Sequence, residues 1–447
     1  MDLIAGIPFF GGFLSTVLPF VVVLGIVVSV HEYGHYIVAR WCGIRADVFS
    51  IGFGPVLWSR VDRRGTVWQL AALPLGGYVK FHGDSDGSSR ADPAALARMS
   101  ADERAETFHG ASVGRRMLTV LAGPFFNFLL SVVVFAGLAL WFGMPTERPT
   151  LGEIAPLPGV VQPLETGDVL LEVNGRPIGD FGDVYLAATE MPQPGPMAFV
   201  IERAGQRMHV EAPFAMPPLV GDVMPLSPAS RAGLKPGDVI MAADGAPLVS
   251  FEDLRKAVTG SGGREIALDV WRDGANLRLP ITPREQDADD GQGGFERRVM
   301  IGAVSASLYQ PMTATPAPWT AIGLGVERVG AVIVQSLNGL RSIIAGAIGA
   351  DNLQGPLGIA QISGETASQG LASFVALIGV ISTAIGLLNL FPIPVLDGGH
   401  FVAFVIEAIR GRPPSERVMQ VAMSIGLGLI LLLMVFATYN DIMRMVS

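Results

Sequence analysis

The chain has 447 residues, of which 50% are hydrophobic and 16% charged, and its formal net charge is −9. This composition is too apolar and too poor in charge for a typical soluble enzyme, and the lack of a long Lys/Arg cluster argues against nucleic-acid binding. A single cysteine, Cys42, excludes an intramolecular disulfide framework and is interpreted as a packing residue. An integral membrane protein with soluble insertions fits these values.

The first long apolar stretch, residues 13–30, contains no charged residue and leads directly into His-Glu-Tyr-Gly-His at 31–35. If the helix continues, the spacing places His31 and His35 on one face, about one turn apart, where both imidazoles can bind one Zn²⁺ beside Glu32. Ionisable residues within a spanning helix are costly and are functional by default. The pentapeptide is therefore interpreted as a metalloprotease signature, with a chance match as the alternative.

Four stretches are long and apolar enough to cross a bilayer, which takes about 20 residues. The first transmembrane helix is predicted within residues 1–42. It is not interpreted as a cleaved signal peptide, because no Lys or Arg precedes Arg40. The other three helices are predicted at 117–144, within 371–412 and at 417–440.

Lys and Arg residues lie in both short segments that connect predicted helices, residues 43–116 and 410–417. The positive-inside rule predicts that both segments are cytoplasmic. The large segment after the second helix then lies on the outer face of the membrane. His31 and His35 lie toward the cytoplasmic end of the first helix.

The cytoplasmic loop, residues 43–116, begins with the pattern of a β-hairpin. Strands predicted at 55–60 and 66–73 flank a turn, and Gly-Gly-Tyr follows at 76–78. A hairpin placed directly after the metal-motif helix can fold back toward the site and offer an unpaired edge to an extended peptide. A cap without a role in substrate binding explains the same pattern.

Polar and helix-breaking residues interrupt the second apolar stretch at Gly123, Pro124 and Asn127. A lone Asn in a lipid-embedded helix usually hydrogen-bonds to a neighbouring helix, which indicates helix association. Proximity of Asn127 to the metal site is the alternative interpretation.

An internal repeat occupies the outer segment, because residues 166–181 recur at 236–251 with a constant offset of 70 residues. Each copy contains Gly-Asp before a strand, an Asn-Gly or Asp-Gly turn, and a Phe before a helix. The repeat resembles a pair of circularly permuted PDZ domains of exported bacterial proteases, at 150–213 and 214–283. This resemblance implies strand addition by extended peptides. Two packed domains that bind nothing are the alternative.

Residues 284–370 are interpreted as a linker followed by membrane-surface helices. The acidic, Gly-rich stretch 286–298 is typical of a linker or a mobile edge. The stretch 319–348 is apolar with interspersed charges, which favours one or two amphipathic helices on the outer membrane surface over a fifth span.

A catalytic zinc needs a third protein ligand besides two histidines. The stretch 389–400 places Pro392 and Pro394 where the third helix must break, and irregular backbone at membrane depth is tolerated only within protein or around a cavity. Asp397, which follows this break, is the predicted third ligand. His400 competes with it on the local sequence alone.

Three features together resemble the bacterial branch of the site-2 protease family of intramembrane zinc metalloproteases. They are the pentapeptide at 31–35, the Asn-x-x-Pro-x-x-x-x-Asp-Gly pattern at 389–398, and the tandem repeat between the second and third helices. The resemblance implies an α-helical polytopic membrane protein with about four transmembrane helices, a cytoplasmic membrane-associated β-hairpin and two α+β PDZ domains. It also implies the bacterial inner membrane, periplasmic PDZ domains and an active site toward the cytoplasm.

The resemblance further implies roles for individual residues. It makes His31, His35 and Asp397 the zinc ligands and Glu32 the general base. It makes Asn389, Gly76, Gly77 and Tyr78 the residues that hold the substrate.

Members of this family cut single-span membrane proteins, often anti-sigma factors, after another protease has removed the outer domain. In that scheme the PDZ pair filters substrates by size or binds the trimmed end, and no nucleic acid takes part. Two other functions fit parts of the sequence: an inactive PDZ-bearing membrane scaffold, and a proton-coupled transporter with buried His and Asp. A complete set of ligands with a base argues against the scaffold, and the lack of an inverted repeat argues against the transporter.

Overall fold

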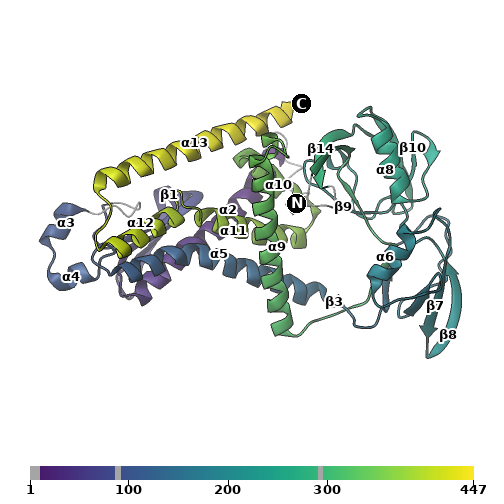
Figure 1. Cartoon of the computed structure of the whole chain (residues 1–447), viewed down its shortest axis with the longest axis horizontal. Helices are drawn as coiled ribbons and strands as arrows, with labels where there is room; N and C mark the ends of the chain where they lie inside the picture. The colour runs from purple at the N-terminus through teal and green to yellow at the C-terminus, as the bar shows by residue number, and fades with distance from the viewer. Residues whose placement is uncertain (1–10, 86–91, 290–294, 447) are drawn as a thin grey trace. The chain divides into compact units, whose positions relative to one another are not determined.

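The computed structural model describes residues 11–85, 92–289 and 295–446. The chain divides into two compact units (Figure 1). The second unit consists of Ala139–Ala317 with Ala347–Gly349 and contains most of the strands. The first unit holds the remainder, including the long apolar helices and the hairpin that follows the first of them.

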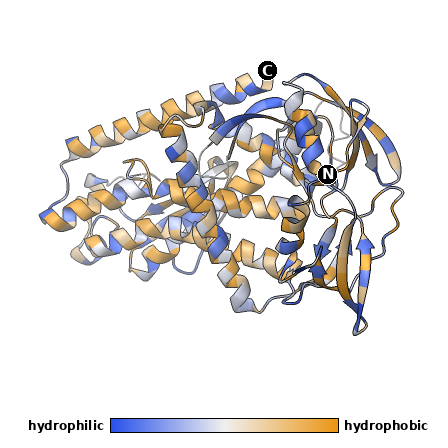
Figure 2. Cartoon of the chain, turned by 45° about the vertical axis from the view of Figure 1, so that its right-hand side comes forward, coloured by the Kyte–Doolittle hydropathy of each residue, from blue (hydrophilic) through white to orange (hydrophobic). Residues whose placement is uncertain are grey.

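Five helices among the described residues are long and apolar enough to cross a membrane. Figure 2 shows hydrophobic residues along most of their length. The chain is therefore a multi-pass membrane protein. These helices are α2 (Gly11–Trp41), α5 (Val113–Phe142), α9 (Pro318–Ile344), α11 (Leu371–Asn389) and α13 (Glu416–Val446).

Helix α9 lies in the region where the sequence predicts one or two amphipathic surface helices. It is one continuous helix of 27 residues, and by length and composition it is also a fifth candidate span. Four small or branched residues at spacings of three and four residues form its buried face: Ala321, Gly325, Val329 and Val332. At Gly325 there is no room for a side chain, because an added Cβ would lie 2.6 Å from the Val132 carbonyl oxygen of α5.

Shorter helices connect these long ones. They are α3 (Pro93–Arg98), α4 (Ala101–Ala105), the 3₁₀ turn η1 (Ala350–Asn352), α10 (Pro356–Gln369) and α12 (Asp397–Arg410). The predicted break in the third helix is the segment between α11 and α12, because Pro392 and Pro394 cannot continue a helical hydrogen-bond ladder. Arg116 of α5 makes a two-pronged ion pair with Glu407 of α12, at 3.1 and 2.7 Å, which ties α12 to α5.

A seam of small and hydroxyl side chains joins α5 to α11. Ser131 of α5 donates to the Gly379 carbonyl at 2.8 Å, and Ser382 of α11 donates to the Asn127 carbonyl at 2.8 Å. Both serines are fully buried. Since lipid offers no hydrophobic drive for association, such close packing and interhelical hydrogen bonds hold the two helices together.

The hairpin after α2 consists of β1 (Ala46–Val61) and β2 (Val67–Phe81), which extend beyond the predicted strands. Ser50 pairs with both Gln69 and Tyr78, and Ile51 pairs with both Leu70 and Gly77. The first half of β1 therefore lies between the two halves of β2. The second half of β2, residues 77–80, is an outer strand.

A polar cluster fastens the hairpin to the end of α2. Asp62, in the turn between β1 and β2, accepts hydrogen bonds from the Tyr36 hydroxyl at 3.1 Å and the Trp68 indole at 3.3 Å. Tyr36 belongs to α2 and is 1% exposed. The hairpin is thereby held in a fixed position against the helix that carries the histidines.

The repeat in the sequence is a repeat in the structure of the second unit. Each copy has a four-stranded antiparallel sheet, in the order β6-β5-β7-β8 and β11-β10-β12-β13. The first copy contains β4 (Leu151–Ile154), β5 (Val169–Val173), β6 (Arg176–Pro177), α6 (Phe181–Thr189), β7 (Met197–Arg203) and β8 (Gln206–Ala212). The second contains β9 (Val220–Val223), α7 (Pro228–Arg231), β10 (Val239–Ala243), β11 (Ala246–Pro247), α8 (Phe251–Gly260), β12 (Ile266–Arg272) and β13 (Ala275–Ile281).

The turns explain why these repeated residues fold alike. Asn174 and Asp244 have positive φ angles of 50° and 49°, each followed by a glycine with positive φ, as a tight turn between paired strands requires. The Asn174 side chain also accepts a hydrogen bond from the Ala198 amide of β7 at 3.0 Å, and the Asp244 side chain accepts one from the Ala267 amide of β12 at 2.9 Å. Both helices α6 and α8 start with a capping box.

The segment after the second copy is not a linker. Its described residues form β14 (Arg284–Asp289), β15 (Phe295–Met300), β16 (Ala303–Ser305), β17 (Tyr309–Pro311) and β18 (Thr313–Ala314). Strand β16 pairs with β9, β17 pairs with β4, and β18 pairs with β3 (Met144–Pro145).

The linker interpretation of 286–298 is therefore wrong for the described part of that stretch, which forms a two-stranded hairpin, whereas the alternative of a mobile edge stays a prediction. Residues 290–294 lie outside the described residues. Across this hairpin Asp287 lies opposite Arg297, and the two form an ion pair of 3.6 Å. Likewise, each repeat receives a strand from beyond the predicted domain end at 283. Sequence periodicity cannot reveal such a strand, because its partner is distant in the chain.

Candidate metal centre

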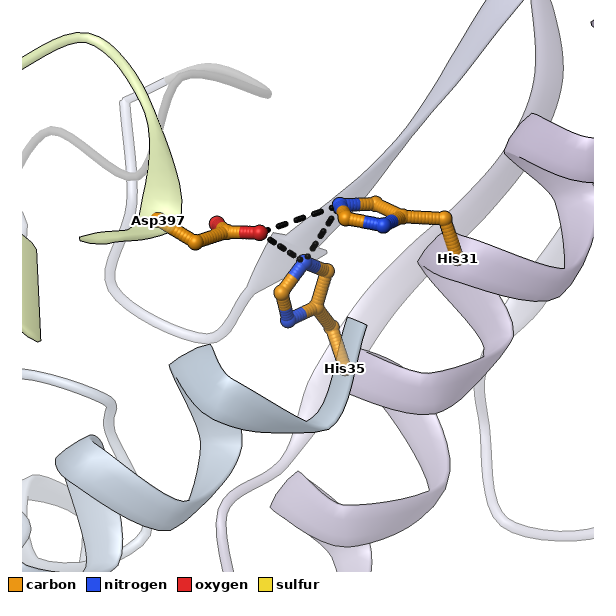
Figure 3. Close-up of side chains that lie close together, drawn as sticks. All are labelled: His31, His35 and Asp397. Atoms are coloured by element: carbon orange, nitrogen blue, oxygen red, sulfur yellow. Dashed lines mark hydrogen bonds and ion pairs between the residues drawn. The ribbon is translucent and has the colours of Figure 1, made fainter. Parts of the chain in front are cut away.

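The two histidines of the pentapeptide lie on α2, and Asp397 approaches them from the start of α12 (Figure 3). Nε2 of His31 lies 3.1 Å from Nε2 of His35. Oδ2 of Asp397 lies 3.1 Å from the first nitrogen and 3.4 Å from the second. Within the described residues, these three form the group of His, Cys, Asp and Glu side chains close enough to hold a metal ion.

The donor set and its spacing fit zinc. Ligand distances of about 2.0–2.1 Å at tetrahedral angles separate the ligand atoms by about 3.3 Å, close to the three separations in this group. Two imidazoles and one carboxylate also leave a fourth position free for water, as catalytic sites require. Oδ2 of Asp397 is buried, and the polar atoms beside it are the Nε2 atoms of His31 and His35, so a cation shared by all three is the partner that suits it.

The segment that connects α11 and α12 packs tightly against the first turn of α12, which begins with Asp397. A Cβ added to Gly398 would lie 2.4 Å from the carbonyl oxygens of Leu390 and Phe391, and one added to Gly399 would lie 2.3 Å from that of Ile393. Contacts this short are not tolerated, so only glycine fits at both positions. The two glycines after Asp397 therefore let the loop return beside the helix that starts with the ligand.

Helix α5 approaches the histidines so closely that it also needs glycine. A Cβ on Gly123 would lie 2.4 Å from His35 Nε2 and 2.7 Å from His31 Cε1. On α2, a Cβ on Gly34 would lie 2.6 Å from the Ala122 carbonyl oxygen. Facing glycines thus bring α2 and α5 together and leave the space that the two imidazoles occupy.

Each histidine has a polar contact at its other ring nitrogen. Nδ1 of His35 lies 2.8 Å from the Thr119 carbonyl oxygen, to which a protonated Nδ1 donates. Nδ1 of His31 lies 3.2 Å from Nδ2 of Asn127, which is fully buried. Asn127, interpreted from sequence chiefly as a helix-association residue, therefore contacts the metal group as well as supporting the seam with α11.

The outer strand of the hairpin lies beside Glu32. A Cβ on Gly77 would lie 3.2 Å from Glu32 Cγ, and the backbone amide of Val79, on the same strand, lies near the Glu32 carboxylate. The hairpin thus folds back onto the metal-motif helix, as the first of the two sequence interpretations expects. Glu32 lies between the histidines in sequence and faces an outer strand in the structure.

The other predicted site residues make contacts with their own neighbours. Tyr78 accepts a hydrogen bond from Gln69 at 3.0 Å and stacks with Phe53, whose ring also packs on Gly76. Asn389, the last residue of α11, donates to the Ile385 carbonyl of its own helix at 3.1 Å.

His400, the competing third ligand, is not part of the converging group within the described residues. It lies in the first turn of α12, where its backbone amide donates to the Leu396 carbonyl at 3.2 Å. The geometry therefore favours Asp397 over His400.

Two contacts of the site have no signal in the sequence. Thr119 acts through its backbone carbonyl, which every residue has, and Val79 through its amide N–H, which every residue except proline has, so residue type does not reveal them. Gly123 is visible in the sequence only as an interruption of an apolar helix. Its role follows from the closeness of α5 to α2.

Comparisons with known proteins agree with this geometry. A sequence model of peptidase family M50 matches residues 19–433. A protein of Agrobacterium fabrum named "Putative zinc metalloprotease" is 38% identical over 98% of this chain and 98% of its own length. The "Regulator of sigma E protease" of Salmonella typhi is 34% identical over 95% of this chain and 98% of its own length.

Proposed function

This chain belongs to peptidase family M50, and from that premise we propose that it is a zinc metalloprotease that cuts peptide bonds within or near the transmembrane segments of single-span membrane proteins. The observation that carries the proposal is the convergence of His31, His35 and Asp397 beside Glu32, in a unit built of membrane-length helices. The names of the similar proteins support zinc as the metal.

The three ligands and Glu32 have separate roles in this proposal. Zinc held by His31, His35 and Asp397 supplies Lewis acidity, which polarises the scissile carbonyl and makes water a better nucleophile near neutral pH. Glu32 takes the proton of the attacking water and passes it to the leaving amine. The Val79 amide, near the Glu32 carboxylate, helps to orient it.

The outer strand formed by residues 77–80 is the proposed docking edge for substrate. A transmembrane helix hides its scissile carbonyl within its own hydrogen bonds, so it must unwind before it can be cut. An extended peptide can then pair with a strand edge. The contact between Gly77 and Glu32 supports this role, because it places the edge directly beside the proposed base. Asn389 is proposed to contact the substrate backbone once its side chain leaves the Ile385 carbonyl.

The natural substrates are proposed to be membrane-anchored regulators such as anti-sigma factors. The sigma E regulator among the similar proteins supports this choice. The two repeats of the second unit are proposed to be PDZ domains that restrict or receive trimmed substrates. The distribution of Lys and Arg supports an inner-membrane orientation with those repeats in the periplasm and the metal group toward the cytoplasm.

Replacement of Glu32 by Gln tests the proposal. Purified full-length protein in detergent should contain about one zinc per chain and cleave a single-span model substrate. Glu32→Gln should keep its zinc, and its rate of cleavage should fall by about 10²- to 10⁴-fold, the usual contribution of a general base. Glu327→Gln, at an exposed position on α9, is the matched control and should behave like the wild type.

Metal analysis and cleavage together separate the alternatives. Wild-type protein that binds zinc but cleaves no membrane substrate would support a scaffold. Protein without zinc that moves protons across vesicles would support a transporter. Activity of Glu32→Gln near that of the wild type would exclude Glu32 as the base.

A further inference from the structure

We propose that Asn127 is a positioning residue that fixes the ring of His31 by accepting a hydrogen bond from its Nδ1–H. This inference rests on the proposed zinc site and assigns a role to a residue of α5 rather than to another ligand. Two observations carry it: the contact of the Asn127 carboxamide with Nδ1 and its complete burial.

The chemistry of a metal-binding imidazole fixes what Asn127 must do. A neutral imidazole carries one N–H, so a ring that presents the lone pair of Nε2 to a metal must carry its proton on Nδ1. At His35 this proton has an acceptor, the Thr119 carbonyl oxygen at 2.8 Å. At His31 the group within reach of Nδ1 is the side chain of Asn127, at 3.2 Å.

The carboxamide of Asn127 can serve as this acceptor. Its two ends have nearly the same shape, and one is a donor while the other is an acceptor. The end beside Nδ1 of His31 is Nδ2, which suits the tautomer protonated on Nε2. A rotation of the amide by 180° brings Oδ1 to the same place, and this oxygen is buried without a hydrogen bond among the described residues. The rotated amide favours the tautomer that binds metal through Nε2.

The backbone and the side chain of Asn127 have different partners. Gly123, one turn earlier on α5, leaves the space into which both rings project. The Asn127 carbonyl accepts a hydrogen bond from Ser382 of α11, which holds this part of α5 against α11, and another from Ser131 of its own helix. The backbone of Asn127 therefore serves the helix seam, while its side chain is free to serve the ligand. A residue that only joined helices would not need to contact an imidazole.

Zinc affinity distinguishes an Asn127 that positions His31 from an Asn127 that only joins helices. Full-length wild type, Asn127→Asp, Asn127→Leu and Ser382→Ala are compared by competition with a chelator, and by the visible absorption of the cobalt-substituted proteins. Asn127→Leu, which has no acceptor, should bind zinc about 10- to 100-fold more weakly, the usual cost of losing such a partner. Asn127→Asp, which keeps an acceptor, should stay within about threefold of wild type and keep its cobalt spectrum.

Ser382→Ala is the control for the helix seam. It removes a hydrogen bond to the Asn127 backbone, leaves the side chain in place, and should not change zinc affinity. Equal zinc affinity in Asn127→Leu and wild type would overturn the inference and leave the zinc site intact. A loss in Asn127→Asp as large as that in Asn127→Leu would also overturn it. A wild type that binds no zinc would overturn the zinc site itself, and this inference with it.

Discussion

Buried polar groups serve different purposes in the two units. In the second unit, Asp238 is fully buried and accepts two hydrogen bonds of 2.6 Å from Arg272 and one of 2.8 Å from the Lys235 amide. Its counterpart in the first repeat, Asp168, is paired in the same way with Arg203. Burial alone would raise the pKa of Asp168, but hydrogen bonds from Arg203 and the Glu165 amide outweigh it and hold that pKa below its usual range.

In the first unit, buried polar atoms remain without such partners. Oδ2 of Asp397 and Oδ1 of Asn127 have no hydrogen bond among the described residues, although both are shielded from solvent. Leaving a buried polar atom unpaired costs about 1–3 kcal/mol, so a folded protein keeps such atoms where a ligand or a reaction uses them. The side-chain amide of Gln162 in the second unit is also buried without a hydrogen bond among the described residues, so it is the position of Asp397 and Asn127 beside the two histidines that links their oxygens to the site.

The largest effect on zinc is expected from Asp397→Ala. Apparent zinc-binding energies of about 10–16 kcal/mol are shared among the ligands, so the loss of one should weaken binding on the order of a thousand-fold. His400→Ala should leave affinity nearly unchanged, because His400 lies outside the converging group. Metal analysis after dialysis against a chelator measures both. The opposite pattern would make His400 the third ligand.

A smaller loss is expected from Gly123→Ala, which changes no polar group. Its methyl group would lie 2.4 Å from His35 Nε2, so the rings must move and zinc affinity should fall roughly 10- to 100-fold, as for other disturbances next to ligands. Gly137→Ala is the matched control on the same helix, because an added Cβ there meets no atom within 4 Å. Equal zinc titrations for the two variants would mean that α5 does not confine the ligands.

Asp238→Ala should have no effect on zinc and a large one on the second unit. Removing one partner of a buried, hydrogen-bonded ion pair costs about 3–5 kcal/mol. Proteolysis of the second unit within the full-length protein should therefore become much faster, while zinc content stays that of the wild type. The control is Asp269→Ala, whose partner Arg278 is 69% exposed, and whose loss should cost at most about 1 kcal/mol. Loss of zinc in Asp238→Ala would contradict the division of roles between the units.

Short-range patterns in the sequence predict much of this protein. The spacing of His31 and His35 places both on one helical face, because an α-helix repeats every 3.6 residues. The repeat at an offset of 70 predicts the strand, turn and helix order of both copies, because Asn-Gly and Asp-Gly turns and capping residues act locally. Pro392 and Pro394 likewise predict the break before Asp397.

Contacts between distant segments needed the tertiary structure. Sequence alone left Asp397 and His400 as competing ligands, and only the tight loop over Gly398 and Gly399 brings one of them to the histidines. The strands that β16 and β17 add to the repeats, and the approach of Asn127 to His31, likewise join residues far apart in the chain. Residue type determines what a side chain or turn can do locally, whereas which groups meet depends on how helices and strands pack, and no local pattern encodes that packing.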